Sequence, residues 1–132
     1  MFWMPLEPRI KAGIVSAWFN ERRNKMVIPD DRYSCFLPTT EEYVFVSGWL
    51  TEFSDDDVVS MICPRPLQIQ HGKQDHIAYW PQVVEEFDRA KVHYQKLGME
   101  NRIDLVMHEG FHEAIVDNGV AFLSKWLKSD GK

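Results

Sequence analysis

Apolar and polar positions along the chain change period several times, which predicts short strands that alternate with helices. Residues 67–71 (LQIQH) alternate strictly between apolar and polar, which is typical of a strand. Residues 10–15 (IKAGIV), after the turn at Pro8, and residues 102–107 (RIDLVM) are short apolar segments that predict two further strands. The three segments are well separated along the chain, so each pair leaves room for a crossover connection.

Three other segments have helical patterns. Ser54, followed by three aspartates, predicts an N-cap and an acidic first turn for a short helix that Pro64 stops. A longer helix is predicted from Pro81, which suits a first turn, to Gly98, which suits a C-cap. A last helix is predicted to open at His112 or Glu113. The expected apolar faces are Val84, Phe87, Lys91 (its aliphatic stem), Tyr94 and Leu97 in the long helix, and Ile115, Gly119, Phe122, Leu123, Trp126 and Leu127 in the last helix.

This order of elements predicts an α/β fold with about three parallel strands and right-handed crossover helices. We expect residues 1–132 to form one domain, because their number suits one domain. Residues 20–57 are predicted to be an irregular excursion that is rich in turn residues. Within it, residues 43–46 (YVFV) are apolar and fit a helix or a strand equally well.

Composition narrows the class of protein. Hydrophobic residues make up 45% of the chain and charged residues 27%, which is ordinary for a globular domain and argues against disorder. The formal net charge of −5 argues against nucleic-acid binding and against a basic membrane-surface helix. Cys35 and Cys63 are too few for a disulfide scaffold. With no long apolar run and no signal-peptide pattern, we expect a cytoplasmic protein that uses no cofactor.

Titratable residues follow the second and third predicted strands. Residues 71–76 (HGKQDH) come after one strand and residues 108–113 (HEGFHE) after the next. Because parallel strands place their carboxyl ends at one edge, Asp75 is expected to meet the ring of His112. A carboxylate that orients an imidazole is part of a Ser-His-Asp triad. In the alternative interpretation, Asp75 and His112 only cap the helices that follow them.

The same region contains a second pattern. Residues 108–112 (HEGFH) match H-E-x-x-H, a zinc signature in which both histidines lie on one continuous helix. Here the preceding residues are strand-like and Gly110 lies inside the pattern. A zinc hydrolase that uses His108, Glu109 and His112 is therefore a third, weaker hypothesis.

Residues 62–67 (ICPRPL) and 72–75 (GKQD) resemble the α/β-hydrolase superfamily, most closely its acetyl-xylan-esterase and dienelactone-hydrolase-like members. In that family an A-P-R-P-L segment leads into a late strand, and G-x-x-D presents the acid of the catalytic triad. Residues 110–113 (GFHE) are similar to the family's G-G-H-E around the catalytic histidine. The resemblance implies that Asp75 is the acid and His112 the base.

The chain departs from the family where the nucleophile is expected. The family places a serine in a G-x-S-x-G elbow between a strand and a helix, and this sequence has no such motif. Residues 8–12 (PRIKA) look like the family's entry into the strand that follows the elbow. The resemblance thus implies the C-terminal portion of a hydrolase. Ser16 and Ser47 are the serines considered as replacements, although neither has paired glycines around it.

Two main functions follow from this resemblance. The chain is an acyl-ester hydrolase if a partner or another serine completes the site, and it is a very weak one alone. Alternatively, it is a non-catalytic, oligomeric binding module descended from a hydrolase. In both cases the strand at residues 10–15 lacks the neighbour that it has in the family. We therefore expect a homodimer or higher oligomer that completes the sheet at this exposed edge, and a small-molecule ester as a possible ligand.

Overall fold

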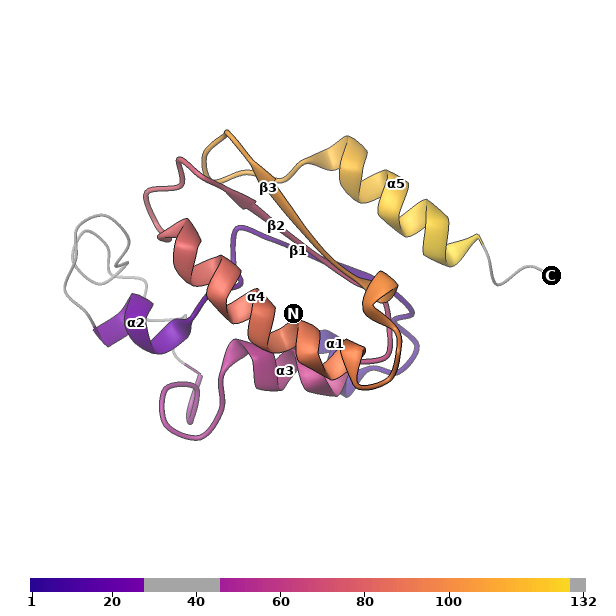
Figure 1. The fold of residues 1–132 in the computed structure, drawn as a ribbon, viewed down its shortest axis with the longest axis horizontal. Helices are drawn as coiled ribbons and strands as arrows, with labels where there is room; N and C mark the ends of the chain where they lie inside the picture. The colour runs from indigo at the N-terminus through magenta and orange to yellow at the C-terminus, as the bar shows by residue number, and fades with distance from the viewer. Residues whose placement is uncertain (28–45, 129–132) are drawn as a thin grey trace.

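The computed structural model describes residues 1–27 and 46–128, and its centre is a three-stranded parallel sheet. The strands are β1 (Gly13–Ser16), β2 (Leu67–Gly72) and β3 (Ile103–His108), in the spatial order β1-β2-β3 (Figure 1). The predicted α/β class and the parallel strands are confirmed. Among the described residues, no helix has the length and apolar character needed to cross a bilayer.

Strand register brings the loops that follow β2 and β3 to the same end of the sheet. Leu67 in β2 is paired with Gly13 in β1 and with Ile103 in β3. At the other end, Gly72 is paired with His108, so the carboxyl ends of β2 and β3 coincide. Among the described residues, β1 is hydrogen-bonded only to β2 and is therefore an edge strand.

Helices cover both faces of the sheet (Figure 1). On one face lie α1 (Trp3–Leu6), α3 (Asp55–Ile62) and α4 (Trp80–Gln95), with α3 packed against α4. On the opposite face lies α5 (Val116–Leu127), whose Gly119 is close to Ile14 of β1 and Gln70 of β2. Two short elements complete the described fold: α2 (Arg22–Val27) follows β1, and η2, a 3₁₀ helix (Glu100–Arg102), leads into β3.

The hydrophobic core lies between the sheet and the first group of helices. Alternate side chains of the three strands point into it, as the two-residue period of a strand requires. Burying these side chains is the main favourable contribution to the stability of the fold. The buried core comprises Met4, Val15, Phe19, Val58, Val59, Ile62, Leu67, Ile69, Val83, Phe87, Ala90, Tyr94 and Ile103.

The opposite face of the sheet is polar. Gln68 and Gln70 are almost completely buried under α5, and their side-chain amides are hydrogen-bonded to each other (2.9 Å). Gln68 also donates to Asp104 of β3 (2.9 Å). The helix can lie close to this face because Gly119 has no side chain: a Cβ there would lie 2.8 Å from Cδ1 of Ile14. The glutamines are thus buried with partners.

Two strand and helix boundaries differ from those predicted. The first strand begins at Gly13 and not at residue 10, because the Ile10 carbonyl accepts a hydrogen bond from the Arg65 guanidinium (3.1 Å). The last helix begins at Val116 and not at His112 or Glu113. Glu113 is part of a tight turn in which its carboxylate accepts from the Phe111 N–H (3.1 Å).

The buried faces of the two longer helices were also predicted only in part. In α4, Phe87 and Tyr94 are buried as expected, and the buried face is rotated toward Val83 and Ala90. Glu86 lies on the same face, where it accepts a hydrogen bond from the Asp56 N–H (2.8 Å). Leu97 is 54% exposed and lies beyond the end of α4 at Gln95.

In α5, Gly119 and Phe122 are buried as expected. Leu127, however, is 51% exposed, because it lies on the flank of α5 and outside its buried face.

The segment predicted as irregular contains regular structure as well. The helix α2 lies within residues 20–57, and α3 begins at Asp55. The predicted N-cap of α3 is confirmed: Ser54 and Asp57 form a reciprocal capping box. Residues 28–45, which include Cys35 and most of the apolar segment at 43–46, lie outside the described residues.

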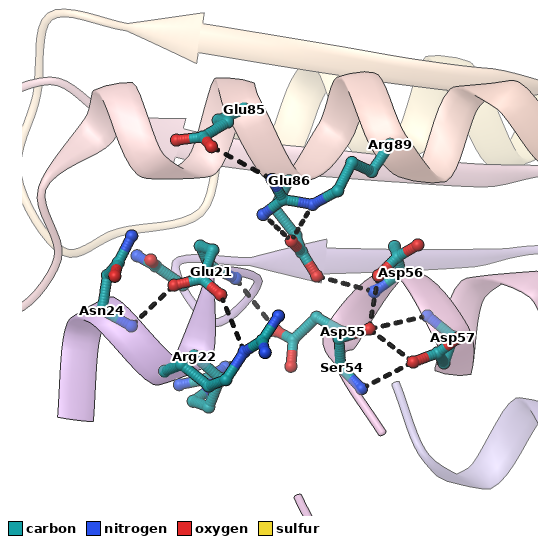
Figure 2. A network of polar contacts seen from close by, with 12 residues as sticks. Glu21, Arg22, Asn24, Ser54, Asp55, Asp56, Asp57, Glu85, Glu86 and Arg89 are labelled. Atoms are coloured by element: carbon teal, nitrogen blue, oxygen red, sulfur yellow. Dashed lines mark hydrogen bonds and ion pairs between the residues drawn. The ribbon is translucent and has the colours of Figure 1, made fainter. Parts of the chain in front are cut away.

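A network of charged side chains joins α2, α3 and α4 (Figure 2). Arg22 of α2 forms an ion pair with Asp55, the first residue of α3 (2.9 Å). Glu86 of α4 accepts from the backbone of α3 and also pairs with Arg89. These contacts hold three helices together at the start of α3, on the face of the sheet that carries the core.

Candidate acid–base site

The loops after β2 and β3 meet directly, and a glycine makes the contact possible. The Lys73 N–H donates to the His108 carbonyl (2.8 Å), and the Gln74 N–H donates to the Gly110 carbonyl (3.0 Å). A Cβ on Gly72 would lie 2.2 Å from the Phe111 carbonyl oxygen and 2.4 Å from that of Gly110. Only a residue without a side chain allows this approach.

This contact places Asp75 beside His112. The Asp75 side chain is completely buried, and its Oδ2 lies 2.9 Å from Nδ1 of His112. Its other oxygen, Oδ1, accepts from the Ile77 N–H (2.8 Å). With both oxygens engaged, the carboxylate is fixed in orientation. It favours the His112 tautomer that carries a proton on Nδ1.

The second ring nitrogen of His112, Nε2, remains available. The His112 side chain is 50% exposed, and no hydrogen bond joins Nε2 to another described residue. With Nδ1 protonated, Nε2 is a proton acceptor. The pair therefore has the geometry of an imidazole that a carboxylate orients, as in a general base.

Gln70 fixes the segment that follows His112. Its side-chain Oε1 accepts from the Ile115 N–H (2.9 Å), and its Nε2 donates to the Ile115 carbonyl (3.1 Å). One buried amide thus binds both backbone groups of one residue. This contact anchors the loop three residues beyond His112 to the centre of the sheet.

Two further histidines, His108 and His71, lie near Asp75 and His112. His108 accepts a hydrogen bond at Nδ1 from the Gly110 N–H (3.1 Å), which shapes the turn before His112. His71 is 1% exposed, and burial lowers the pKa of its imidazole below the ordinary value. His71 therefore stays neutral near neutral pH and adds no competing positive charge beside Asp75.

The two candidate serines do not contact His112. The Ser16 hydroxyl is at the end of β1 and donates to Oε1 of Gln70 (2.8 Å). Ser47 is exposed in the turn that precedes α3. The described residues thus bring the acid and the base together and leave both serines elsewhere.

The H-E-x-x-H pattern does not form a helix. His108 ends β3, and residues 109–115 are a loop that precedes α5. Glu109 is exposed and pairs with Lys73 (2.6 Å). Among the described residues, no group of three or more His, Cys, Asp or Glu side chains is arranged to hold a metal ion. The zinc hypothesis predicts both histidines on one continuous helix, and this prediction is wrong.

Cys63 is a free thiol that is partly buried, and burial raises the pKa of this thiol. The raised pKa disfavours the thiolate, the nucleophilic form. Cys63 also lies before β2, at the opposite end of the strand from the loop of Asp75. It is therefore a poor candidate for the missing nucleophile.

A pocket next to the pair was not predicted from the sequence. Its volume is about 300 Å³, and the loop between β2 and α4 supplies most of its lining. The lining residues are Lys73, Gln74, Asp75, His76, Ala78, Tyr79, Trp80 and Phe111. The signal that could have revealed it is the cluster of rings at residues 76–80 (HIAYW), directly after a strand that carries a candidate acid.

Comparison with known proteins adds one finding. No protein-family profile and no curated protein matches this chain. Among solved structures, it is similar to a carbohydrate esterase family 15 (CE15) glucuronoyl esterase from Caldicellulosiruptor kristjansonii, with a TM-score of 0.71 and 18% sequence identity. The similarity covers 96% of this chain and 39% of the esterase chain. The chain thus shares the fold of a part of that esterase and spans less than half of its length.

Proposed function

We propose that this chain supplies the acid and the base of a site that hydrolyses carboxylic esters. The observation that carries the proposal is the contact between the buried Asp75 carboxylate and Nδ1 of His112 (2.9 Å), in a side chain that is half-exposed. The fold shared with part of an esterase supports the same class of reaction. The specific resemblance to acetyl-xylan esterases and dienelactone hydrolases remains part of this proposal.

The proposed reaction uses His112 twice. Nε2 accepts the proton of a nucleophilic hydroxyl while the hydroxyl oxygen attacks the ester carbonyl carbon. The same proton then passes to the departing alcohol oxygen as the acyl–oxygen bond breaks. Water repeats the sequence and releases the acid. Asp75 remains ionised throughout and stabilises the imidazolium form of His112.

The nucleophile and the oxyanion hole must come from other residues. We propose that a second polypeptide, here a second copy of this chain, completes the sheet beside β1. Two observations support this. Among the described residues, β1 has a neighbouring strand on one side only, and the helices α1 and α5 carry exposed apolar side chains. These side chains are Trp3 and Leu6 of α1 and Val116, Val120 and Leu127 of α5.

The same surface supports the second candidate function, a binding module without catalysis. In that case the oligomer forms in the same way and His112 has no chemical role. Light scattering after size exclusion tests the shared step. We expect a dimer or larger species for the wild-type chain and a shift toward monomer for Val120→Lys. A monomer at high concentration contradicts both the proposed dimer and the completed site.

Hydrolysis of an activated acetate ester separates the two functions. We expect slow but measurable turnover by the purified chain and its loss in His112→Ala. The matched control is His93→Ala, because His93 also faces an aspartate, Asp56, but at 3.6 Å and on α4. Turnover that is equal in the wild-type chain and in His112→Ala contradicts the catalytic role. If His112→Ala alone loses activity, Ser16→Ala and Ser47→Ala identify whether either serine is the nucleophile.

A further inference from the structure

The pocket beside the acid–base pair has a size that limits its ligand. A volume of about 300 Å³ is at the lower end of the range for small-molecule sites. It suits one six-membered ring with small substituents. The pocket shares Asp75 with the site, and Phe111, another lining residue, directly precedes His112. A bound ring would therefore lie next to the proposed base.

Aromatic side chains form much of the pocket wall. Tyr79 is 37% exposed, Trp80 38% and Phe111 55%, so each keeps free surface although apolar rings are usually buried. The His76 ring lies against that of Phe111, with centroids 6.0 Å apart and planes tilted by 42°. Partly exposed rings around a hollow favour a planar ligand ring that stacks on them.

Lys73 is the group of the pocket that can bind an anion. Among the described lining residues, Asp75 is the one carboxylate, and both its oxygens already accept hydrogen bonds. Lys73 is the one lysine or arginine in that described lining, and its ammonium pairs with Glu109, which is 76% exposed. Such surface ion pairs contribute little stability, so a ligand carboxylate can replace Glu109 on Lys73.

We infer that this pocket binds a small ring carboxylate, that is, a single six-membered ring bearing one carboxylate group. The ring stacks against Trp80 and Tyr79, and the carboxylate accepts hydrogen bonds from the Lys73 ammonium. Such a ring is part of the substrate only if the proposed ester hydrolysis is correct. The binding itself does not depend on that reaction.

Nuclear magnetic resonance titration of the purified chain tests the inference with three probes. Benzoate carries both features, benzamide lacks the charge, and cyclohexanecarboxylate lacks the aromatic ring. We expect benzoate to shift the amide signals of Gln74, His76 and Phe111. We expect at least fivefold weaker binding of benzamide. Binding of cyclohexanecarboxylate that equals that of benzoate would leave the carboxylate contact intact and overturn the stacking.

Variants assign the two contacts. Trp80→Ala is expected to weaken benzoate binding at least fivefold, whereas Trp80→Phe keeps a ring and most of the affinity. Val92→Ala is the matched control, because Val92 is 39% exposed on the same helix, α4, and lines no part of the pocket. If Trp80→Ala binds benzoate as well as Val92→Ala does, the ring is not held there.

Two charge variants should act in opposite directions. Lys73→Gln is expected to weaken benzoate binding to the level of benzamide, and Glu109→Gln to strengthen it severalfold by removing the competing carboxylate. If neither changes the affinity, the carboxylate contact is refuted. Benzoate binding without ester hydrolysis would refute only the proposed function. Hydrolysis that depends on His112 without benzoate binding would refute only this pocket assignment.

Discussion

Asp55 and Asp75 are both completely buried carboxylates, yet their surroundings differ in one respect. Asp55, at the start of α3, has only buried partners: the guanidinium of Arg22, the indole of Trp49 and the backbone of Asn20. Asp75 has one backbone partner and one partner that reaches the surface, the half-exposed ring of His112. The first arrangement is closed and the second is open.

In the closed arrangement, the partners of Asp55 are themselves buried and fixed in place. Arg22 is itself 2% exposed and lies over the ring of Trp49, 4.1 Å from its centroid. Burial raises the pKa of Asp55, and the contacts with Arg22, Trp49 and Asn20 act against this rise. Arginine remains charged at any ordinary pH. Nothing in this cluster reaches solvent to exchange a proton.

The open arrangement allows proton transfer. Histidine gains and loses a proton near neutral pH, and half of the His112 side chain is accessible. A buried carboxylate thus stabilises structure when its partner is a buried arginine, whereas with an exposed histidine as its partner the imidazole stays accessible to a proton donor or acceptor. Burial of the carboxylate alone does not distinguish the two roles.

The largest expected effect concerns the closed cluster. Arg22→Met removes the cation and leaves Asp55 buried without its charged partner, so we expect a loss of roughly 4 kcal/mol of unfolding free energy. His112→Ala, at the open pair, should cost less than about 1 kcal/mol, because the ring is half-exposed. Chemical denaturation of both variants measures the difference. Equal losses would show that the two carboxylates play the same structural role.

The next effect tests whether the open pair depends on the close approach of its loops. Gly72→Ala places a methyl group against two backbone carbonyls, which cannot swing aside as a side chain can. We expect a loss of about 3 kcal/mol of unfolding free energy together with loss of ester hydrolysis. Gly13→Ala is the control, because its methyl group would meet only the flexible end of Met4. Full activity in Gly72→Ala would contradict the proposed site.

The last effect changes stability alone and concerns a third buried carboxylate, Glu86. Burial raises the pKa of Glu86 from 4.5 to about 7, so the folded chain keeps this proton to higher pH than the unfolded chain. Its stabilising contribution is therefore complete below pH 4.5 and is lost as the pH rises toward 7. We expect this loss to reach about 3 kcal/mol.

Glu86→Gln keeps the acceptor for the Asp56 N–H and removes the titration. The unfolding free energy of this variant should fall less between pH 4.5 and pH 7.5 than that of the wild-type chain. Glu85→Gln is the control, because Glu85 is 60% exposed. A wild-type pH dependence in Glu86→Gln would show that burial of Glu86 has no such consequence.

The sequence predicts the sheet and the meeting of Asp75 with His112 because both follow from short-range patterns. Alternation identifies β2, the α/β order predicts parallel strands, and parallel strands bring their following loops together. The contact then needs only the short spacing of Asp75 and His112 from their strands. The spacing alone leaves two separate helix caps as an alternative, and the resemblance to the α/β-hydrolase superfamily favours the contact.

Long-range contacts explain what the sequence does not predict. The last helix, α5, begins later than predicted, directly after Ile115, whose N–H is hydrogen-bonded to Gln70, 45 residues away along the chain. The rotation of α4 accompanies a contact between Glu86 and the backbone of α3. The pocket combines Phe111 with residues 73–80, which only the folded sheet brings together. Local periodicity contains none of these partners.

The side chain of Gln70 binds Ile115 as a residue of a neighbouring strand would. Its planar amide accepts from the N–H and donates to the carbonyl of Ile115, as the C=O and N–H of one residue in an adjacent antiparallel strand do. Position 70 therefore needs a side chain that has both a donor and an acceptor at this distance. Asparagine is one methylene too short to reach, and glutamate has no donor for the carbonyl. A residue outside the Asp75–His112 pair thus sets the path of the loop that carries His112.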